Sequence, residues 1–448
     1  MSAPLEQLLR DARIDLVLAR IEKNDSVIDE VIENIDNDVR SIRFNSILVL
    51  GEIGEKAGEK AANKISHYLN DEDWSIRREA ARTLGKIGKL AENAVDNLVR
   101  LIEDPERSIR IAVTSCLGKI GKSSSDSLNC LRVALKDKDE EVRAEAAASL
   151  GLLGSEAFVA IPDLMEGLKD PNWIVRTASA KSISEIGKGS IKTIPNLIYA
   201  LGDRDWRVRY RVVNTLSQIG EPAIPSILEV LDSKDSVVRK GAIEALGEIK
   251  SDKPEIIAAI ARRLSDRNEA VRGKAADSLR SIGKHSVPAL LSALESVKNK
   301  MATVVISALG GIGVEAREAI PYLISIIVDK PKKVRVEIAR TLGKIGFDSN
   351  QAVEGLKTLL NDKKPRVRRE AALSLGKLGS TAESAISNLL IVLEDKNPDV
   401  RWRATEALGN IGVNKPEIVS SLKLMIKDEC DYVCESADNA IDKITGEY

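Results

Sequence analysis

A short motif returns about every 33 residues along the chain, and this period constrains the fold more than any other feature of the sequence. Its copy at residues 71–88 reads Asp-Glu-Asp-Trp-Ser-Ile-Arg-Arg-Glu-Ala-Ala-Arg-Thr-Leu-Gly-Lys-Ile-Gly, with the repeated arginine at position 77. A fixed period of this length is typical of a solenoid, in which each unit buries its apolar face against the next. The arginine recurs as Arg43, Arg77, Arg110, Arg143, Arg176, Arg209, Arg239, Arg272, Arg335, Arg368 and Arg401, and two further copies have Ala302 and Cys434 in its place.

Each unit predicts two helices. The first is typified by residues 160–169, where Pro162 falls in the first turn and its missing N–H leaves no hydrogen bond unmade. The second surrounds the arginine and ends at a glycine, which suits a left-handed backbone at a helix end. We therefore expect an all-α fold, a right-handed α-α superhelix (a solenoid) of about thirteen two-helix repeats. The terminal glycines include Gly54, Gly88, Gly121, Gly154 and Gly187.

The start of the chain differs from the repeats. Residues 4–22 have the apolar spacing of one extra amphipathic helix. We expect residues 1–25 to form an N-terminal capping helix and residues 26–448 to form one continuous solenoid domain.

The repeated arginine is predicted to be structural. On a helical wheel Arg77 falls inside the apolar stripe that contains Ile76 and Ala80, so its buried charge needs a partner. An aspartate precedes the arginine by six residues in ten of the thirteen units, and where Ala302 replaces the arginine, Ser296 replaces the aspartate. We interpret the two residues of a unit as a pair in a structural ladder. The ladder residues include Asp71, Arg77, Asp170, Arg176, Asp203 and Arg209.

The charges of the chain almost cancel, with 67 lysines and arginines against 68 aspartates and glutamates and a formal net charge of −1. A protein whose main partner is nucleic acid usually carries a basic excess, so this class of partner is disfavoured. No apolar run approaches the roughly 18 residues of a membrane span, and the first residues lack a secretory signal. The four cysteines include no Cys-x-x-Cys pair, as is typical of reduced thiols. We expect a monomeric, cytoplasmic protein that does not contact a membrane.

The motif resembles the HEAT-like repeats named after the phycobilisome (PBS) lyases, a family of the armadillo-like helical superfamily. The likeness rests on Asp-x-x-(Trp)-x-(Val/Ile)-Arg followed by Ala, Leu-Gly and a final Gly, as in residues 137–154, and it covers residues 26–446. It implies an armadillo-like superhelix whose second helices line the concave side. It implies less about activity, because this superfold carries scaffolds, enzymes and nucleic-acid binders.

Two classes of enzyme share this repeat architecture. Deoxyhypusine hydroxylases resemble the chain, but that family holds two irons through His-Glu pairs, and the two histidines here, His67 and His285, precede Tyr68 and Ser286. Bilin lyase subunits share the repeats, yet no further motif indicates a chromophore. The chain also lacks a phosphate-binding loop and a nucleophile elbow. We therefore expect no catalytic residue, no metal and no cofactor, and we favour binding over enzymatic activity.

Candidate binding residues are expected where the second helix faces away from the core. Aromatic residues make up only 3% of the chain, yet several occupy such positions. In units five and six Trp173, Trp206, Arg207, Tyr210 and Arg211 would lie on adjacent helices, and these residue types are enriched at binding hot spots. Packing of each tryptophan over the start of a neighbouring helix is the alternative interpretation. The further aromatic candidates are Trp74 and Trp402.

Units ten to twelve predict a second binding surface. Their outward positions carry eight basic residues against four acidic ones, which favours an acidic protein or a phosphate backbone as partner. A solvated helix face with internal ion pairs is the alternative. Unit four is acidic at the same positions, and such alternation suits protein recognition better than nucleic acid. The basic residues are Lys332, Lys333, Arg340, Lys344, Arg366, Arg369, Lys377 and Arg403, and the acidic ones are Glu337, Glu370, Asp399 and Glu406.

The leading functional prediction is a scaffold that binds a macromolecular partner, a protein, along its concave groove by shape and charge complementarity. The alternative is an accessory or catalytic subunit that acts on a protein-bound group, as a bilin lyase or the hydroxylase does. A nucleic-acid-binding HEAT-like protein is the third possibility.

Overall fold

A computed structural model describes residues 3–120, 125–186, 191–297 and 299–446. These residues form helices joined by short turns, and they include no β-strand. They divide into two compact units, Met1–Ser226 and Ile227–Tyr448. From here on, 'unit' means one of these two halves, and each helix pair is called a repeat. The all-α solenoid predicted from the repeat is confirmed, and the described chain holds thirteen helix pairs after two N-terminal helices.

The first unit contains α1 (Leu5–Arg10), α2 (Ile14–Lys23), α3 (Ser26–Glu33), α4 (Arg40–Ile53), α5 (Gly58–His67), α6 (Trp74–Ile87), α7 (Val95–Arg100), α8 (Arg107–Ile120), α9 (Ser125–Ala134), α10 (Glu140–Leu153), α11 (Ile161–Gly167), α12 (Trp173–Ile186), α13 (Ile194–Ala200) and α14 (Trp206–Ile219). The boundary falls within α15 (Ile224–Glu229). The second unit continues with α16 (Ser236–Ile249), α17 (Pro254–Arg262), α18 (Glu269–Ile282), α19 (Val287–Ser296), α20 (Asn299–Ile312), α21 (Ile320–Ser325), α22 (Lys332–Ile345), α23 (Asn350–Leu360), α24 (Pro365–Leu378), α25 (Ile386–Val392), α26 (Pro398–Ile411), α27 (Pro416–Met425) and α28 (Asp431–Thr445).

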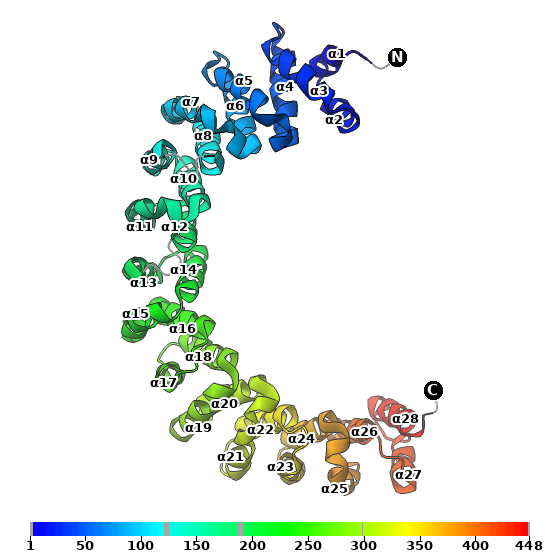
Figure 1. The fold of residues 1–448 in the computed structure, drawn as a ribbon. Coiled ribbons are helices and arrows are strands. Elements are labelled where there is room, and N and C mark those ends of the chain that lie inside the picture. The colour runs from blue at the N-terminus through cyan, green and yellow to red at the C-terminus, as the bar shows by residue number, and fades with distance from the viewer. Residues whose placement is uncertain (1–2, 121–124, 187–190, 298, 447–448) are drawn as a thin grey trace. The chain divides into compact units, whose positions relative to one another are not determined.

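Within each unit the helices form two rows, which can be followed by their labels in Figure 1. From α3 onward the odd-numbered helices are the first helices of the repeats, and the even-numbered helices are the second helices, which carry the repeated arginine except in α20 and α28. Neighbouring second helices of a unit pack against each other, as α10 does against α12 and α24 against α26. The predicted position of Pro162 in the first turn of α11 is confirmed.

The N-terminal segment differs from its prediction. The sequence predicts one helix over residues 4–22, and the structure has two, α1 and α2. The chain turns at Ala12, whose φ is 55°, and the N–H of Arg13 donates to the carbonyl of Leu8 at 2.9 Å. Both helices pack against α4, because the turn presents two short apolar faces to the first repeat instead of one long face. Leu9 and Val17 are accordingly fully buried.

The second helix α6 shows how the sequence sets the length of these helices. Asp73 caps its start by accepting a hydrogen bond of 2.8 Å from the backbone N–H of Ser75. Its apolar stripe, with Ile76 and Leu84, is fully buried. The helix ends at Gly88, whose φ of 72° is readily adopted only by glycine. A positive φ also occurs at the predicted ends Gly54 and Gly154, whereas Gly121 and Gly187 lie outside the described residues.

A row of buried hydroxyl groups joins the second helices, and the sequence interpretation missed it. Six residues after the repeated arginine, Ser182 donates a hydrogen bond of 2.6 Å to the carbonyl of Ala147 in the preceding repeat. Gly151 makes room for this contact, because a Cβ at that position would lie 2.6 Å from the Ser182 hydroxyl. The sequence pattern that could have revealed this row is the serine or threonine directly before the repeated leucine position. Equivalent bonds are donated by Thr83, Ser149, Thr215, Ser278 and Thr341.

One stretch of the described chain, Glu140–Gly167, has the length and mean hydropathy of a membrane span. It consists of α10, a 3-10 helix and α11 in succession, and Gly154 between them has a φ of 57°. In its most apolar window 56% of the residues are buried inside the protein. Packing between neighbouring repeats therefore accounts for its apolar character.

Candidate protein-binding surfaces

The repeated arginine is buried and paired, but its carboxylate partner lies in the following repeat. Arg176 is 4% exposed, and its Nε and Nη2 donate hydrogen bonds of 2.6 and 2.8 Å to the carboxylate of Asp203. Asp170, six residues before it, accepts from Arg176 through its backbone carbonyl at 2.9 Å. The sequence interpretation, which paired the two residues of one unit, is corrected here. A pair 27 residues apart ties each repeat to the next.

Each complete ladder position holds the loop between two helices from both sides. The carboxylate of Asp170 accepts bonds of 2.7 and 3.0 Å from Arg143 of the preceding repeat and one of 2.8 Å from the N–H of Asn172. Its carbonyl accepts from Arg176 of its own repeat. The ladder is therefore a structural element that connects repeats. Its pairs are Arg77–Asp104, Arg110–Asp137, Arg143–Asp170, Arg176–Asp203, Arg239–Asp266, Arg335–Asp362, Arg368–Asp395 and Arg401–Asp428.

Two predicted ladder residues belong to incomplete positions. Asp71 accepts from Arg77 through its carbonyl at 2.8 Å, and its carboxylate accepts from the N–H of Asp73 at 2.8 Å. Arg209 donates to the carbonyl of Asp203 at 2.6 Å. In the sequence of the next repeat, Ser233 stands where the aspartate would be.

The ladder is interrupted inside the second unit. Arg272 is followed, one repeat later, by Ser296 in the aspartate position, and among the described residues it has no carboxylate partner. Asp329 likewise follows a repeat with Ala302 in the arginine position. The sequence interpretation took the replacements at positions 296 and 302 as one missing pair. They instead belong to two different pairs of the ladder, which leaves Arg272 and Asp329 each without its partner position filled.

Trp206 and Tyr210 stand together on the open face of α14. They lie one helical turn apart on the same side, and they are 65% and 57% exposed. On the neighbouring helix α12, Trp173 is half-buried beneath the guanidinium of Arg207, whose Cζ lies 3.3 Å from the centre of the indole ring. Arg211 is half-buried, and its Nε has no hydrogen-bond partner among the described residues. The structure thus brings all five predicted residues together, and we call them the α12–α14 surface.

Asp205 holds Arg207 in place over Trp173. Nε and Nη2 of Arg207 donate bonds of 2.9 and 2.7 Å to its carboxylate, which also caps α14 by accepting from the N–H of Arg207 at 2.9 Å. The side-chain hydrogen bond from Arg207 lowers the pKa of Asp205 to about 2, and the same bond raises the pKa of the guanidinium. The stacked arginine is therefore pre-positioned, and a pre-positioned side chain loses less entropy when a partner binds.

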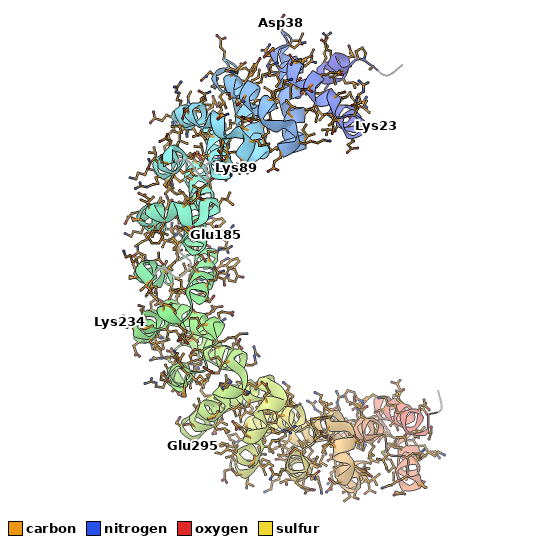
Figure 2. The ribbon with its side chains drawn as sticks, in the orientation of Figure 1. Lys23, Asp38, Lys89, Glu185, Lys234 and Glu295 are labelled. Atoms are coloured by element: carbon orange, nitrogen blue, oxygen red, sulfur yellow. The ribbon has the colours of Figure 1, made fainter. Side chains whose placement is uncertain are left out.

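The same row of second helices carries a pocket over α6 and α8. Its volume is about 450 Å³, and its lining includes the basic residues Arg78, Arg82 and Lys119, with Glu145 of α10 as the acidic residue. Arg78 lies over Trp74, with Cζ 5.1 Å from the ring centre, and Trp74 is 44% exposed. Figure 2 shows the side chains on this row, where Glu185 at the end of α12 is labelled. In the first unit the row therefore carries basic residues and Trp74 at α6 and α8, an acid on α10, and the aromatic residues of the α12–α14 surface.

Trp402 in the second unit is covered by neighbouring side chains. Its ring centre lies 5.6 Å from that of Tyr432, with the ring planes at 77°, which is an edge-to-face contact. Cζ of Arg403 lies 3.6 Å from the same ring centre, and Arg403 forms an ion pair with Glu406. Trp402 therefore fits the packing interpretation, whereas Trp206 has no comparable aromatic or cationic cover in the described chain.

The basic residues predicted on the open face of repeats ten to twelve fall into a paired and an unpaired set. Arg340 donates bonds of 3.0 and 3.2 Å to Glu370 and one of 2.7 Å to Glu337. Arg369 lies 3.6 Å from Asp399. Glu370, predicted on the open face, is corrected, because it is bonded between α22 and α24 and only 4% exposed. The unpaired set, exposed and without an ion-pair partner in the described part of the chain, is Lys332, Lys333, Lys344, Arg366 and Lys377.

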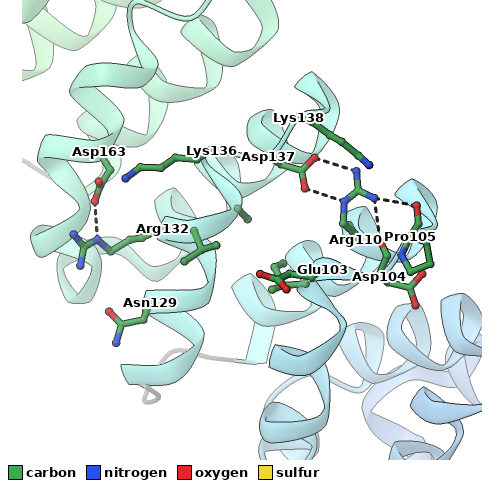
Figure 3. A pocket seen from close by; sticks show the side chains of 13 residues that line it. Glu103, Asp104, Pro105, Arg110, Asn129, Arg132, Lys136, Asp137, Lys138 and Asp163 are labelled. Carbon is green, nitrogen blue, oxygen red and sulfur yellow. Dashed lines mark hydrogen bonds and ion pairs between the residues drawn. The ribbon is translucent and has the colours of Figure 1, made fainter.

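A larger pocket lies away from this row, between the third and fourth repeats (Figure 3). Its volume is about 590 Å³. Its arginines are engaged, Arg110 with Asp137 at 2.8 Å and Arg132 with Asp163 at 2.6 Å, and Figure 3 shows Lys136 extending toward Asp163. Basic and acidic side chains are equal in number around this pocket, so it attracts neither sign of ligand strongly.

The remaining reactive groups offer little chemistry. The described residues contain no group of three or more His, Cys, Asp or Glu side chains placed to hold a metal ion. Cys116 and Cys130 are buried, and burial raises the pKa of the Cys130 thiol to about 12 and that of Cys116 well above its ordinary value. A thiol that stays protonated is a poor nucleophile, so these two cysteines act as small core residues.

Comparison with protein families agrees with this architecture. The chain matches the family model described as HEAT repeats over residues 28–112, 62–150, 95–184, 161–247, 224–310, 287–374, 320–393 and 359–442. No curated protein matches the sequence.

Solved structures of similar fold are solenoids with low sequence identity. Kap121p bound to Ste12p has a TM-score of 0.63 at 14% identity, with 99% of this chain and 58% of that chain covered. Kap121p bound to Nup53p has a TM-score of 0.62 at 14% identity, with the same coverage of 99% and 58%. Importin beta has a TM-score of 0.53 at 13% identity, with 98% of this chain and 73% of that chain covered. The chain spans 58% of the length of the Kap121p chains, and the likeness shows the fold.

Proposed function

The chain belongs to the HEAT repeat family, and from that premise we propose that it is a protein-binding scaffold whose partner contacts the α12–α14 surface. The observation that carries this proposal is the exposure of Trp206 and Tyr210 on one side of α14, at 65% and 57%. Large aromatic side chains left in water are the residues from which interfaces gain most of their binding energy. We expect this face to be the concave side of its unit, as the second helices of such repeats would place it.

The surroundings of the surface favour a protein over a nucleic acid as partner. Along the second helices of the first unit, a basic pocket at α6 and α8 is followed by the exposed acids Glu140 and Glu141 on α10, of which Glu141 is ion-paired with Arg107. A phosphate backbone that ran along this row would meet repulsion at α10. A protein surface can match such alternation with alternating charges of its own.

Two of the structures with similar folds were solved with a protein partner. In these structures Kap121p is bound to Ste12p and to Nup53p. This supports the proposal through the fold alone. A cytoplasmic location is part of the proposal, supported by four free cysteines.

The finer likeness to the repeats of the bilin lyases remains a proposal as well. It is supported by the motif around Arg143 and Arg176 and would make the chain a subunit that acts on a protein-bound group. An absorbance spectrum of the chain purified from its natural host tests it, because a bilin bound to the protein would absorb visible light.

The scaffold proposal is tested with a double variant, Trp206→Ala with Tyr210→Ala. Both side chains are exposed, so we expect an unchanged melting temperature together with loss of the partners that the wild type retains in quantitative affinity capture. The matched control is Tyr199→Ala, which removes a 78% exposed tyrosine from the first helix α13 of the same unit. Partners captured equally by wild type, double variant and control would contradict the proposal.

A further inference from the structure

Two neighbouring second helices of the second unit, α22 and α24, carry a concentration of unpaired positive charge. Lys332 and Lys333 occupy the first turn of α22, and Arg366 occupies the first turn of α24. Lys344 and Lys377 lie near the ends of the same two helices, which pack against each other. All five are exposed, and none has an ion-pair partner in the ranges that the structure describes. We call these five residues the α22–α24 basic face.

The carboxylates of this region are already engaged. Glu370 is 4% exposed and held by both Nε and Nη2 of Arg340, and Glu337 accepts from Nη1 of the same guanidinium. The ladder acid Asp362 is bonded to Arg335. The positive charge of the basic face is therefore not cancelled by these neighbours, and it faces solvent.

The first-turn cations Lys332, Lys333 and Arg366 oppose the stability of their own helices, whereas Lys344 and Lys377 lie in the last turns, where positive charge is favourable. A helix N-terminus carries partial positive charge and is stabilised by acidic residues in the first turn and by a side-chain cap. The helices α6, α10 and α14 have an aspartate cap, whereas α22 and α24 begin after Pro331 and Lys364 with no side-chain cap and with no acidic residue in the first turn. These first-turn cations lower helix stability in two adjacent repeats, and we therefore expect them to serve binding.

The basic face is short, and acidic first turns bound it on the side of α26. It spans two helices of 14 residues, each about 20 Å long. Beyond α24 the sign reverses, because α26 and α28 carry Asp399 and Asp431 in their first turns. On the other side, the neighbouring second helix α20 has no acidic residue in its first turn, and the second helix before it, α18, begins with Glu269.

We propose that the α22–α24 basic face binds an acidic polypeptide segment, extended across the two helices over about six to eight residues. A segment of that length would cover the five cations and end before the acidic first turns of α26 and α28. A longer polyanion would run onto these acids. The helices α22 and α24 also expose no aromatic side chain on which unstacked bases could lie, so a single-stranded nucleic acid fits less well.

The test uses fluorescence anisotropy of the full chain with two probes. One is a labelled peptide of about eight aspartate and glutamate residues, and the other is a labelled single-stranded oligonucleotide of equal charge. We expect the peptide to bind more tightly than the oligonucleotide, with an affinity that falls as salt is added. Lys333→Glu with Arg366→Glu is expected to weaken peptide binding about tenfold or more, because two attractive contacts become repulsive.

The control distinguishes a local effect from a change in net charge. Lys423→Glu with Lys427→Glu reverses two exposed cations at the end of the thirteenth repeat's first helix, and it should leave peptide affinity unchanged. The test variant places acids in the first turns of α22 and α24, so its melting temperature should be kept or raised, which excludes unfolding as the cause. Equal loss in both double variants, tighter binding of the oligonucleotide, or no binding of the peptide would each overturn the proposal.

This surface is separate from the α12–α14 surface, and the two proposals stand independently. The charge-reversed variant keeps Trp206 and Tyr210, and the aromatic double variant keeps all five cations. If the charge-reversed variant loses acidic-peptide binding but captures the same partners, the proposal for the basic face is supported, and this result does not depend on the outcome for the α12–α14 surface.

Discussion

Arg239 and Asp266 are 27 positions apart in the sequence, yet their side chains form two hydrogen bonds of 2.8 Å each, with exposures of only 3% and 4%. The third guanidinium nitrogen, Nη1, donates to the carbonyls of Ser233 and Lys234 in its own repeat. One side chain thus connects two loops of successive repeats. Because a solenoid has contacts only between neighbours, such a connection contributes directly to the coupling between repeats.

Removing this arginine should destabilise the second unit strongly. Arg239→Ala would leave the Asp266 carboxylate buried without its partner, which costs about 3 kcal/mol in comparable buried pairs. The measurement is the urea midpoint followed by circular dichroism. Arg272→Ala, one repeat later, is the matched control, since Arg272 has carbonyl bonds but no carboxylate partner in the described chain. We expect that control to cost about 1 kcal/mol. Equal losses in the two variants would refute the view that the ladder pair is the stabilising contact.

The missing half of the pair at Arg272 can be restored. Ser296 occupies the position where the other repeats have the aspartate, and it is exposed. Ser296→Asp should therefore raise the stability of the second unit by about 1 kcal/mol, the upper range for a partly exposed pair. The gain should vanish when Arg272→Ala is present, which a double-mutant cycle measures. A gain that persists without the arginine would have another origin.

Acid should weaken the ladder. Although burial raises the pKa of Asp137, the hydrogen bonds from Arg110 and from the N–H of Asp139 lower it below the ordinary value. In Asp428 the side-chain bond from Arg401 is the largest cause of a lowered pKa. A carboxylate with a lowered folded-state pKa contributes stability that is fully present above the ordinary pKa of 3.8 and is lost as pH falls through the folded value. We expect the melting temperature to be steady at neutral pH and to drop below about pH 4. A melting temperature that stays constant from neutral to strongly acidic pH would argue against ionised ladder acids.

The sequence predicted the helices well because the information is local and repeated. The apolar period of residues 71–88, the capping Asp73 and the terminal Gly88 each act within a few residues, and thirteen copies of the pattern reinforce one another. The five residues of the α12–α14 surface were found from the same wheel, since one helical phase applies to every copy.

Two of the wrong predictions from the sequence concern contacts between repeats. The sequence could not tell whether Arg176 meets Asp170 or Asp203, because six residues within a loop and 27 residues across a repeat are both compatible with the spacing. Glu370 was placed on the open face for the same reason, because its wheel position does not reveal that Arg340 of the preceding repeat bonds to it. A wheel describes one helix at a time, and these contacts depend on two.

Close packing of second helices makes a further prediction at Gly409 on α26. A Cβ there would lie 2.8 Å from both Cα and Cβ of Ala440 on α28, closer than real Cβ atoms approach. The backbone of α28 cannot retreat without disturbing the last repeat, so Gly409→Ala should destabilise the second unit by about 1–2 kcal/mol, as an overpacked core does. This loss would appear despite the higher helix propensity of alanine.

Gly273, in the interior of α18, provides the opposite case. A Cβ at this exposed position would meet no heavy atom within 4 Å. Gly273→Ala should therefore stabilise the protein by up to about 1 kcal/mol, because alanine restricts the unfolded chain and favours the helix. Thermal melts of the two variants beside the wild type make the comparison. If both alanine variants raise the melting temperature, α26 and α28 do not pack as closely as the structure has them. If only Gly273→Ala raises it, the glycine after the repeated leucine, here Gly409, is required by close packing against the next second helix and not by the helix that contains it.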